Sequence, residues 1–202
     1  MTGLRERKRA RTKETIASVA LDLFDRQGFQ ATTIPQIAEA ADVSPRTVSA
    51  YFPHKEDIAF PDKEEVFSSL ETRLRDRPAG ERTVTAMRDW IGYWVREQAG
   101  REHQHRRLRR VIDADEGLRA YERRLLVRAQ DCLTAAIARD LGVGPDGLEP
   151  RMAAAATMTV FELLGEAFEP TGVDRIDDVL AGIDRALLFI DAGVSALSSA
   201  QP

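Results

Sequence analysis

The sequence predicts an all-α protein of about nine helices, with a small N-terminal domain at residues 10–60 and a larger C-terminal domain at residues 61–202. Two observations support this fold class. Apolar residues recur along most of the chain with the 3.6-residue period of amphipathic helices. Ser, Thr, Pro and Gly stand where these periodic segments begin and end. With 202 residues, 43% of them hydrophobic, the chain is long enough to build a small domain beside a larger one.

The first helix is expected over residues 16–24, which carry an apolar stripe, and it stops at Gly28. Thr33 is the expected N-cap of a second, short helix over Ile34–Ala41. Pro35 is tolerated there because it lies in the first turn.

A third helix is expected to begin at Pro45, with Ser44 as its N-cap. Only Asp42 and Val43 separate this cap from the second helix. Two short helices joined by a turn of about three residues have the spacing of a helix-turn-helix, here over about residues 33–52.

The rest of the chain continues as helices. Lys55 begins a fourth helix, Pro61 interrupts it, and the pattern restarts over Lys63–Arg75, which predicts a kinked connector between the domains. Further helices are expected from Val84 to near Gly100 and over residues 108–112, 118–141, 152–168 and 176–194.

Charge is distributed unevenly. The formal net charge of −4 by itself argues against a nucleic-acid-binding protein, yet residues 1–55 hold 9 Lys and Arg against 6 Asp and Glu, a formal charge of +3. The bias is strongest at Arg5, Arg7, Lys8, Arg9, Arg11 and Lys13. This segment either reaches the DNA backbone or minor groove, as arms of other helix-turn-helix proteins do, or is a solvated tail.

No secretion signal or membrane span is expected. No apolar run follows the basic segment, and the longest uncharged stretch, Met152–Phe161, is about half of the roughly 20 residues that a spanning helix needs. Cys132 is the only cysteine, and it lies on an apolar helix face, so we interpret it as a core residue of a cytoplasmic protein. His103 and His105 have no third ligand nearby, so we expect no metal and no cofactor.

The stretch ATTIPQIAEAADVSPRTVSAYFPHKEDI, residues 31–58, closely resembles the DNA-binding motif of the tetracycline-repressor (TetR) family. The matching positions are Thr33, Ile37, Ala38, Ala41, Val43, Ser44, Thr47, Tyr51, Phe52 and Lys55. Asp42 replaces the family's usual turn glycine, which is acceptable because Asp tolerates a left-handed backbone, and Ser49 stands where the family often has Tyr.

The second helix of such a motif enters the major groove of double-stranded DNA. Arg46 is the expected base reader, because a guanidinium in the first turn can hold a guanine edge with two hydrogen bonds. Ser49 and Ala50 are expected to face the groove, and the helix start at Ser44 and Pro45 to face phosphate. The resemblance implies phosphate contacts by Thr33, Thr47, Tyr51 and Lys55.

The resemblance also implies a homodimer formed through the last two helices, a palindromic operator and repression relieved by a small-molecule effector. Apolar side chains that either line an effector pocket or pack the core are Trp90, Tyr93, Trp94, Met158, Phe161 and Phe168. The arginines of residues 101–110 either attract an anionic effector such as an acyl-CoA or form a solvated face paired with Glu102, Asp113, Asp115 and Glu116.

Two other function classes are disfavoured. An enzyme would need a nucleophile beside a base, a glycine-rich phosphate loop or a metal-spaced cluster, and the sequence contains none. A nonspecific DNA-coating protein would be basic throughout, whereas residues 56–202 hold 20 Lys and Arg against 27 Asp and Glu.

Overall fold

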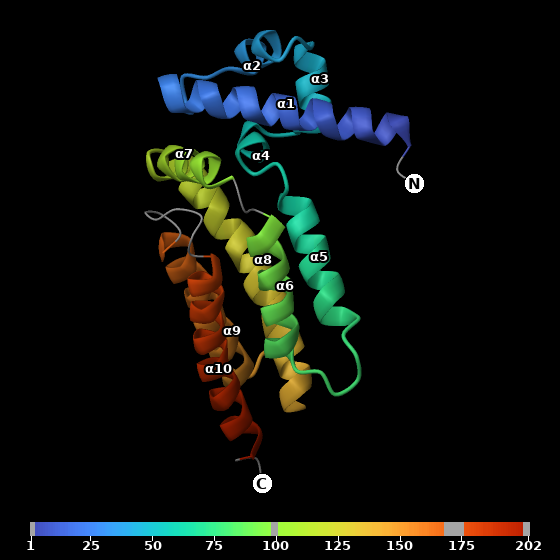
Figure 1. The fold of residues 1–202 in the computed structure, drawn as a ribbon, viewed down its shortest axis with the longest axis vertical. Helices are drawn as coiled ribbons and strands as arrows, with labels where there is room; N and C mark the ends of the chain where they lie inside the picture. The colour runs from blue at the N-terminus through green and yellow to red at the C-terminus, as the bar shows by residue number, and fades with distance from the viewer. Residues whose placement is uncertain (1–2, 98–100, 168–175, 200–202) are drawn as a thin grey trace. The chain divides into compact units, whose positions relative to one another are not determined.

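The computed structural model describes the backbone of residues 3–97, 101–167 and 176–199, and their side chains apart from residues 102, 161–167, 176, 179 and 197–199. These residues form ten helices and no strand, which confirms the all-α prediction (Figure 1). The helices are α1 (Leu4–Gln27), α2 (Ile34–Ala40), α3 (Pro45–Tyr51), α4 (Lys55–Ala59), α5 (Lys63–Arg75), α6 (Thr83–Glu97), α7 (Glu102–Asp113), α8 (Glu116–Leu141), α9 (Leu148–Ala167) and α10 (Ile176–Ser199). None of the described helices is long and apolar enough to cross a membrane.

The expected kinked connector is two separate helices, α4 and α5. Phe60 is the C-cap of α4, and Pro61 and Asp62 form the turn before α5 begins at Lys63. Proline has no backbone N–H and its ring crowds the preceding turn, so a helix ends more readily than it continues through residue 61.

The chain divides into two compact units, and neither is continuous in sequence. Unit 1 combines residues 1–65 with 103–123, and unit 2 combines residues 66–102 with 124–202. Residues 103–123, which the sequence analysis assigns to the C-terminal domain, therefore pack with the N-terminal helices.

The core of unit 1 draws on the helix-turn-helix and on residues far from it in sequence. Ile16, Ile37 and Val48 are fully buried, from α1, α2 and α3 respectively. Val111 and Ile112 of α7 and Leu118 of α8 belong to the same cluster, and Leu118 is fully buried. Because a core this small gains stability from every buried apolar side chain, α7 and the start of α8 are part of what holds the N-terminal helices together.

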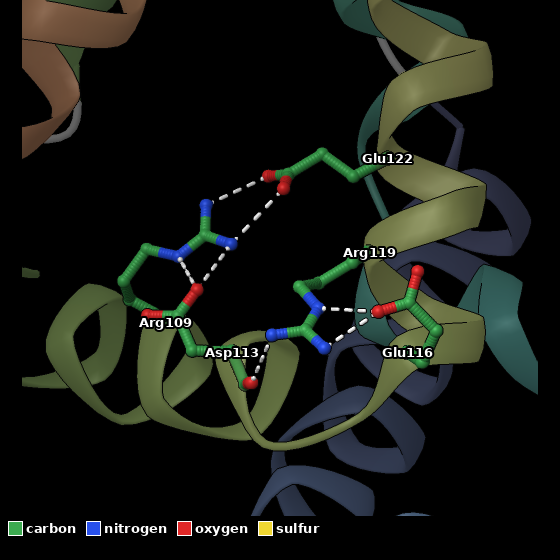
Figure 2. Close-up of polar contacts among 5 residues, drawn as sticks. All are labelled: Arg109, Asp113, Glu116, Arg119 and Glu122. Carbon is green, nitrogen blue, oxygen red and sulfur yellow. Dashed lines mark hydrogen bonds and ion pairs between the residues drawn. The ribbon is translucent and has the colours of Figure 1, made fainter.

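The corner between α7 and α8 is held by arginine–carboxylate pairs (Figure 2). Arg109 of α7 donates to both carboxylate oxygens of Glu122 in α8, at 2.9 and 3.0 Å, and to Asp113 at 3.0 Å. Arg119 donates to Glu116 at 3.0 and 2.5 Å and to the Asp113 carbonyl at 3.1 Å. Paired bonds of a planar guanidinium restrict the corner's geometry more than a single ion pair does.

Unit 2 contains α6, α9, α10 and most of α5 and α8, and α10 packs against α9 and α6. Its core includes the fully buried residues Leu133, Ile137, Ile183 and Leu187. Arg77 pairs with Asp140, and Asp140 also accepts the backbone N–H of Thr83 at 2.7 Å, which joins α8 to the start of α6.

Candidate nucleic-acid interface

The turn between α2 and α3 depends on Asp42, which has a positive φ of 53°. Two hydrogen bonds close the end of α2: the N–H of Val43 donates to the Ala38 carbonyl at 2.9 Å, and the N–H of Asp42 donates to the Glu39 carbonyl at 3.2 Å. This pair of bonds is a Schellman motif, which requires a left-handed residue after the helix. The prediction that Asp42 takes over the conformational role of the usual glycine is confirmed.

Both predicted caps are present. The Thr33 hydroxyl accepts the N–H of Gln36 at 3.4 Å, and the Gln36 side chain accepts the N–H of Thr33 at 2.9 Å, so α2 begins with a capping box. The Ser44 hydroxyl accepts the N–H of Thr47 at 3.0 Å and lies 2.8 Å from the Thr47 hydroxyl. Pro45 occupies the first turn of α3 without loss, because its position has no intrahelical N–H partner.

Helix α3 has one buried face and one open face. Val48 is fully buried and Phe52 nearly so, which fixes the helix on the core of unit 1. Arg46, Ser49 and Ala50 are exposed, and no partner is assigned to the guanidinium of Arg46 among the described residues. The side chains predicted to face bases are therefore the ones that the packing leaves open to solvent.

The predicted phosphate contact Lys55 has a second role that the sequence did not reveal. Its ammonium donates to the carbonyls of Phe29 and Thr32, at 2.9 and 3.0 Å, and lies 4.2 Å from the centre of the Phe29 ring. An ammonium has three donors, so Lys55 holds the loop between α1 and α2 and keeps one donor for another acceptor.

A polar cluster inside unit 1 connects α4, α5 and α8. It is formed by Asp57, Lys63 and Tyr121. The Asp57 carboxylate accepts the N–H of His54 at 3.0 Å, the Tyr121 hydroxyl at 2.5 Å and the Lys63 ammonium. Burial raises the pKa of Asp57, but the hydrogen bonds from Lys63, Tyr121 and His54 outweigh it, so that this pKa lies below its ordinary value. No sequence signal links Tyr121 to Asp57, because 64 residues separate them.

Three arginines of the run at residues 101–110 form ion pairs, partly with other acids than expected: Arg107, Arg109 and Arg110. Arg107 binds Asp22 at 2.6 Å and Asp25 at 3.0 Å, both on α1, and Arg110 lies 3.3 Å from Asp25. Asp113 pairs with Arg109 as expected. Two other predicted acids have different partners: Asp115 accepts from Gln30, and Glu116 binds Arg119 and Arg123. The side chain of Glu102 lies outside the described residues.

Two tryptophans of α6 share a hydrogen-bond acceptor in unit 2, the hydroxyl of Ser69. The indole N–H groups of Trp90 and Trp94 point to the Ser69 hydroxyl, at 3.0 and 3.3 Å, and Tyr93 meets the Trp94 ring edge to face. Met158 is buried in the core of the same unit. The side chain of Phe161 and the whole of Phe168 lie outside the described residues.

Cys132 packs against the core of unit 2, as predicted. Cys132 is half-buried against the core of unit 2, and burial raises the pKa of its thiol, which leaves it less reactive. Within the described residues, no three His, Cys, Asp or Glu side chains are grouped to hold a metal ion.

Comparison with known proteins agrees with this geometry. Residues 16–60 match the family model described as bacterial regulatory proteins, tetR family. The HTH-type transcriptional regulator TcmR of Streptomyces glaucescens is 42% identical over 85 residues, which cover 42% of this chain and 38% of TcmR. The chain thus matches well under half the length of this regulator.

Solved structures extend the likeness of fold to most of the chain. A SmeT–triclosan complex covers 88% of this chain and 90% of its own, with a TM-score of 0.62 and 21% identity. FadR of Thermus thermophilus, described as a repressor in complex with lauroyl-CoA, covers 90% of this chain and 94% of its own, with a TM-score of 0.57 and 22% identity.

The matched relatives are described as regulators. The motif match covers the caps, the Schellman turn and the buried face of α3, and so includes the residues whose geometry defines a helix-turn-helix. Over residues 16–60 the chain is similar to bacterial regulatory proteins of the tetR family, and over 85 residues it is similar to TcmR.

Proposed function

We propose that this protein is a cytoplasmic, sequence-specific transcriptional repressor that binds double-stranded operator DNA through α3. The observation that carries the proposal is the open face of α3, where Arg46, Ser49 and Ala50 are exposed on a helix held by its cap and by the buried Val48. Rigid helices present side chains to base edges with less loss of conformational entropy than loops do. Thr33, Ser44, Pro45, Thr47, Tyr51 and Lys55 are the proposed phosphate-side contacts.

Arg46→Ala tests this proposal most directly. We expect the wild-type chain to enrich a common sequence from random duplex DNA at physiological salt, and Arg46→Ala to weaken its binding by about 1–3 kcal/mol and relax the preference at one base pair per half-site. Arg26→Ala, which removes an exposed arginine of α1, is the matched control and should leave the preference unchanged. Failure of the wild-type chain to enrich any sequence would refute the proposal.

The proposed assembly is a two-fold dimer formed through α9 and α10. Large apolar side chains on these helices stay exposed in the single chain: Phe189 and Leu188 of α10 are 78% and 63% exposed, and Leu148 and Met152 of α9 are 66% and 59% exposed. A second copy would remove them from water, and a two-fold dimer reads a palindromic site. The selection experiment therefore has a second readout, because a dimer enriches two inverted half-sites and a monomer enriches one.

The proposed effector site is the aromatic cluster of α6. Trp90, Tyr93 and Trp94 present large, adjacent aromatic surfaces, which suit an apolar small molecule. Triclosan and lauroyl-CoA, which the two fold relatives hold, are the first probes.

An effector releases the operator only if it binds the DNA-free conformer more tightly. Because Trp90 and Trp94 are the only two tryptophans, their fluorescence reports binding near α6. We expect an effector to change this fluorescence and to weaken binding to the selected fragment over the same concentration range. A ligand that changes fluorescence and leaves DNA affinity unchanged at fixed salt would count against release by that ligand.

A further inference from the structure

The first ten residues of α1, Leu4–Lys13, carry six cations and one acid, Glu6. We propose that this segment, the basic helix, binds the phosphodiester backbone of duplex DNA beside the half-site read by α3. The inference rests on the proposed function and adds to it a contact surface that lies outside the matched residues 16–60. In the structure this segment is a helix continuous with α1 and not an extended arm.

The basic helix projects from the core of unit 1. The first buried residue of α1 is Ile16, and residues 3–11 are all exposed. At about 1.5 Å per residue, ten helical residues extend roughly 15 Å past the packed part of the helix. Packing within unit 1 therefore does not explain why this segment is helical and charged.

Four of its six cations form neither an ion pair nor a cation–π contact with the residues that the structure describes. Lys13 lies 3.8 Å from Asp62, and Arg9 stands 5.8 Å from the centre of the Tyr51 ring. Within the part of the chain that the structure describes, Arg5, Arg7, Lys8 and Arg11 form no ion pair. The Glu6 carboxylate accepts the N–H of Gly3 at 3.0 Å and so serves as a cap.

The spacing of these cations is unfavourable unless an anion is present. Arg5 and Arg9, Arg7 and Arg11, and Arg9 and Lys13 are each four residues apart, which places like charges next to one another on a helix and destabilises it. A row of phosphates reverses the sign of this interaction, because each cation then displaces a counterion from the DNA.

The contact between Arg9 and Tyr51 places the basic helix on the side of unit 1 that carries α3. Tyr51 is the last residue of α3, three residues from the buried Val48 and five from the exposed Arg46. A protein that inserts α3 into the major groove thus brings Arg9 and its neighbours near the same duplex, which a basic segment elsewhere on the chain would not do.

The composition favours DNA over a membrane surface. A helix that binds lipid headgroups needs a broad apolar face to enter the acyl boundary. The basic helix has only Leu4 and Ala10 as apolar residues, and its cations occupy more than one face, so it presents charge without a surface to insert. Charges spread in this way suit sequence-independent contacts with phosphates more than bidentate reading of one base edge.

The test compares salt dependence in two variants of the full-length chain with equal charge. The first replaces Arg5, Arg7, Lys8 and Arg11 by Gln, and the control replaces Arg75, Arg88, Arg96 and Arg151 of unit 2, all exposed, by Gln. Equilibrium binding to the selected operator is measured as a function of salt. Because each lost phosphate contact lowers the slope of log K against log salt by about 0.9, and a dimer presents the segment twice, we expect a slope smaller by about 2 or more.

At about 0.15 M salt this corresponds to a loss of affinity on the order of 30-fold for the basic-helix variant relative to the control. A third variant, with Lys at positions 5, 7 and 11, keeps the charges and is expected to keep the wild-type slope. Thermal unfolding of each variant shows whether the fold is retained, and we expect retention because none of these side chains is buried.

Equal slopes for the basic-helix variant and the control would overturn the inference while leaving the proposed function intact. If the wild-type chain enriches no DNA sequence, the proposed function is wrong instead. If the slopes agree and only the basic-helix variant loses binding to vesicles of phosphatidylglycerol, the segment is a membrane-surface element, which also contradicts the proposal.

Discussion

Replacing Leu118 by Ala is expected to lower the free energy of unfolding by about 3 kcal/mol, within the range of 2–5 kcal/mol for buried leucines. Leu118 is fully buried in the core that also contains Ile16, Ile37 and Val48. Removing its side chain leaves a cavity between α8 and the N-terminal helices. We therefore expect faster amide hydrogen exchange in α1, α2 and α3, which lie between 67 and 114 residues before the substitution in sequence.

Two matched substitutions serve as controls for Leu118→Ala. Leu4→Ala removes the same atoms from a side chain that is 78% exposed and lies outside the proposed dimer interface, and it should change stability by less than about 0.5 kcal/mol. Leu187→Ala empties a fully buried site in unit 2 and should accelerate exchange in α9 and α10. If Leu118→Ala accelerates exchange only in α8, the packing of residues 103–123 with the helix-turn-helix is wrong.

Replacing Asp57 by Ala should lower the free energy of unfolding at neutral pH by about 3 kcal/mol, because it leaves Lys63 and Tyr121 without their shared acceptor in a largely buried site. The Lys63 side chain is 17% exposed and the Asp57 side chain 6%, so water replaces the lost bonds poorly. Urea unfolding at pH 7 measures the difference. Asp62→Ala is the control, because its pair with Lys13 is 3.8 Å long and half-exposed and should contribute less than about 1 kcal/mol.

The stability that Asp57 contributes is expected to depend on pH. The pKa of Asp57 is lower in the folded chain than its ordinary value, so the stabilisation is fully present above about pH 4, the ordinary pKa of an unfolded Asp, and is lost as pH falls through the lower folded pKa. The stability difference between wild type and Asp57→Ala should therefore be constant from pH 5 to pH 7 and shrink below about pH 4. A difference that grows on acidification would contradict the assigned hydrogen bonds.

The local parts of the fold could be predicted because their causes lie within a few residues. Thr33 and Ser44 cap helices whose first turns follow directly, and Pro61 ends one helix and allows another to start two residues later. Asp42 takes the left-handed conformation that the spacing of α2 and α3 requires. Caps, turns and helix periods depend on neighbours in sequence, so the helix-turn-helix could be found without a structure.

The long-range parts could not be predicted because their partners are far apart in the chain. The resemblance predicts only a phosphate contact for Lys55. Its hydrogen bonds to the Phe29 and Thr32 carbonyls depend on how the loop after α1 folds back. The acids that neutralise Arg107 lie on α1, more than 80 residues earlier. Sequence spacing identifies candidate pairs only within one helix, where positions three and four apart are neighbours.

By itself, the sequence determined that this protein is helical, that residues 33–52 form a helix-turn-helix and that Arg46 lies on its open face, since short-range hydrogen bonding and apolar periodicity control all three. Only the tertiary structure decided that α7 and the start of α8 complete the core of the N-terminal unit, and that the basic segment continues α1 as a helix beside α3. Burial decides membership of a core, and burial depends on which surfaces meet after the chain has folded.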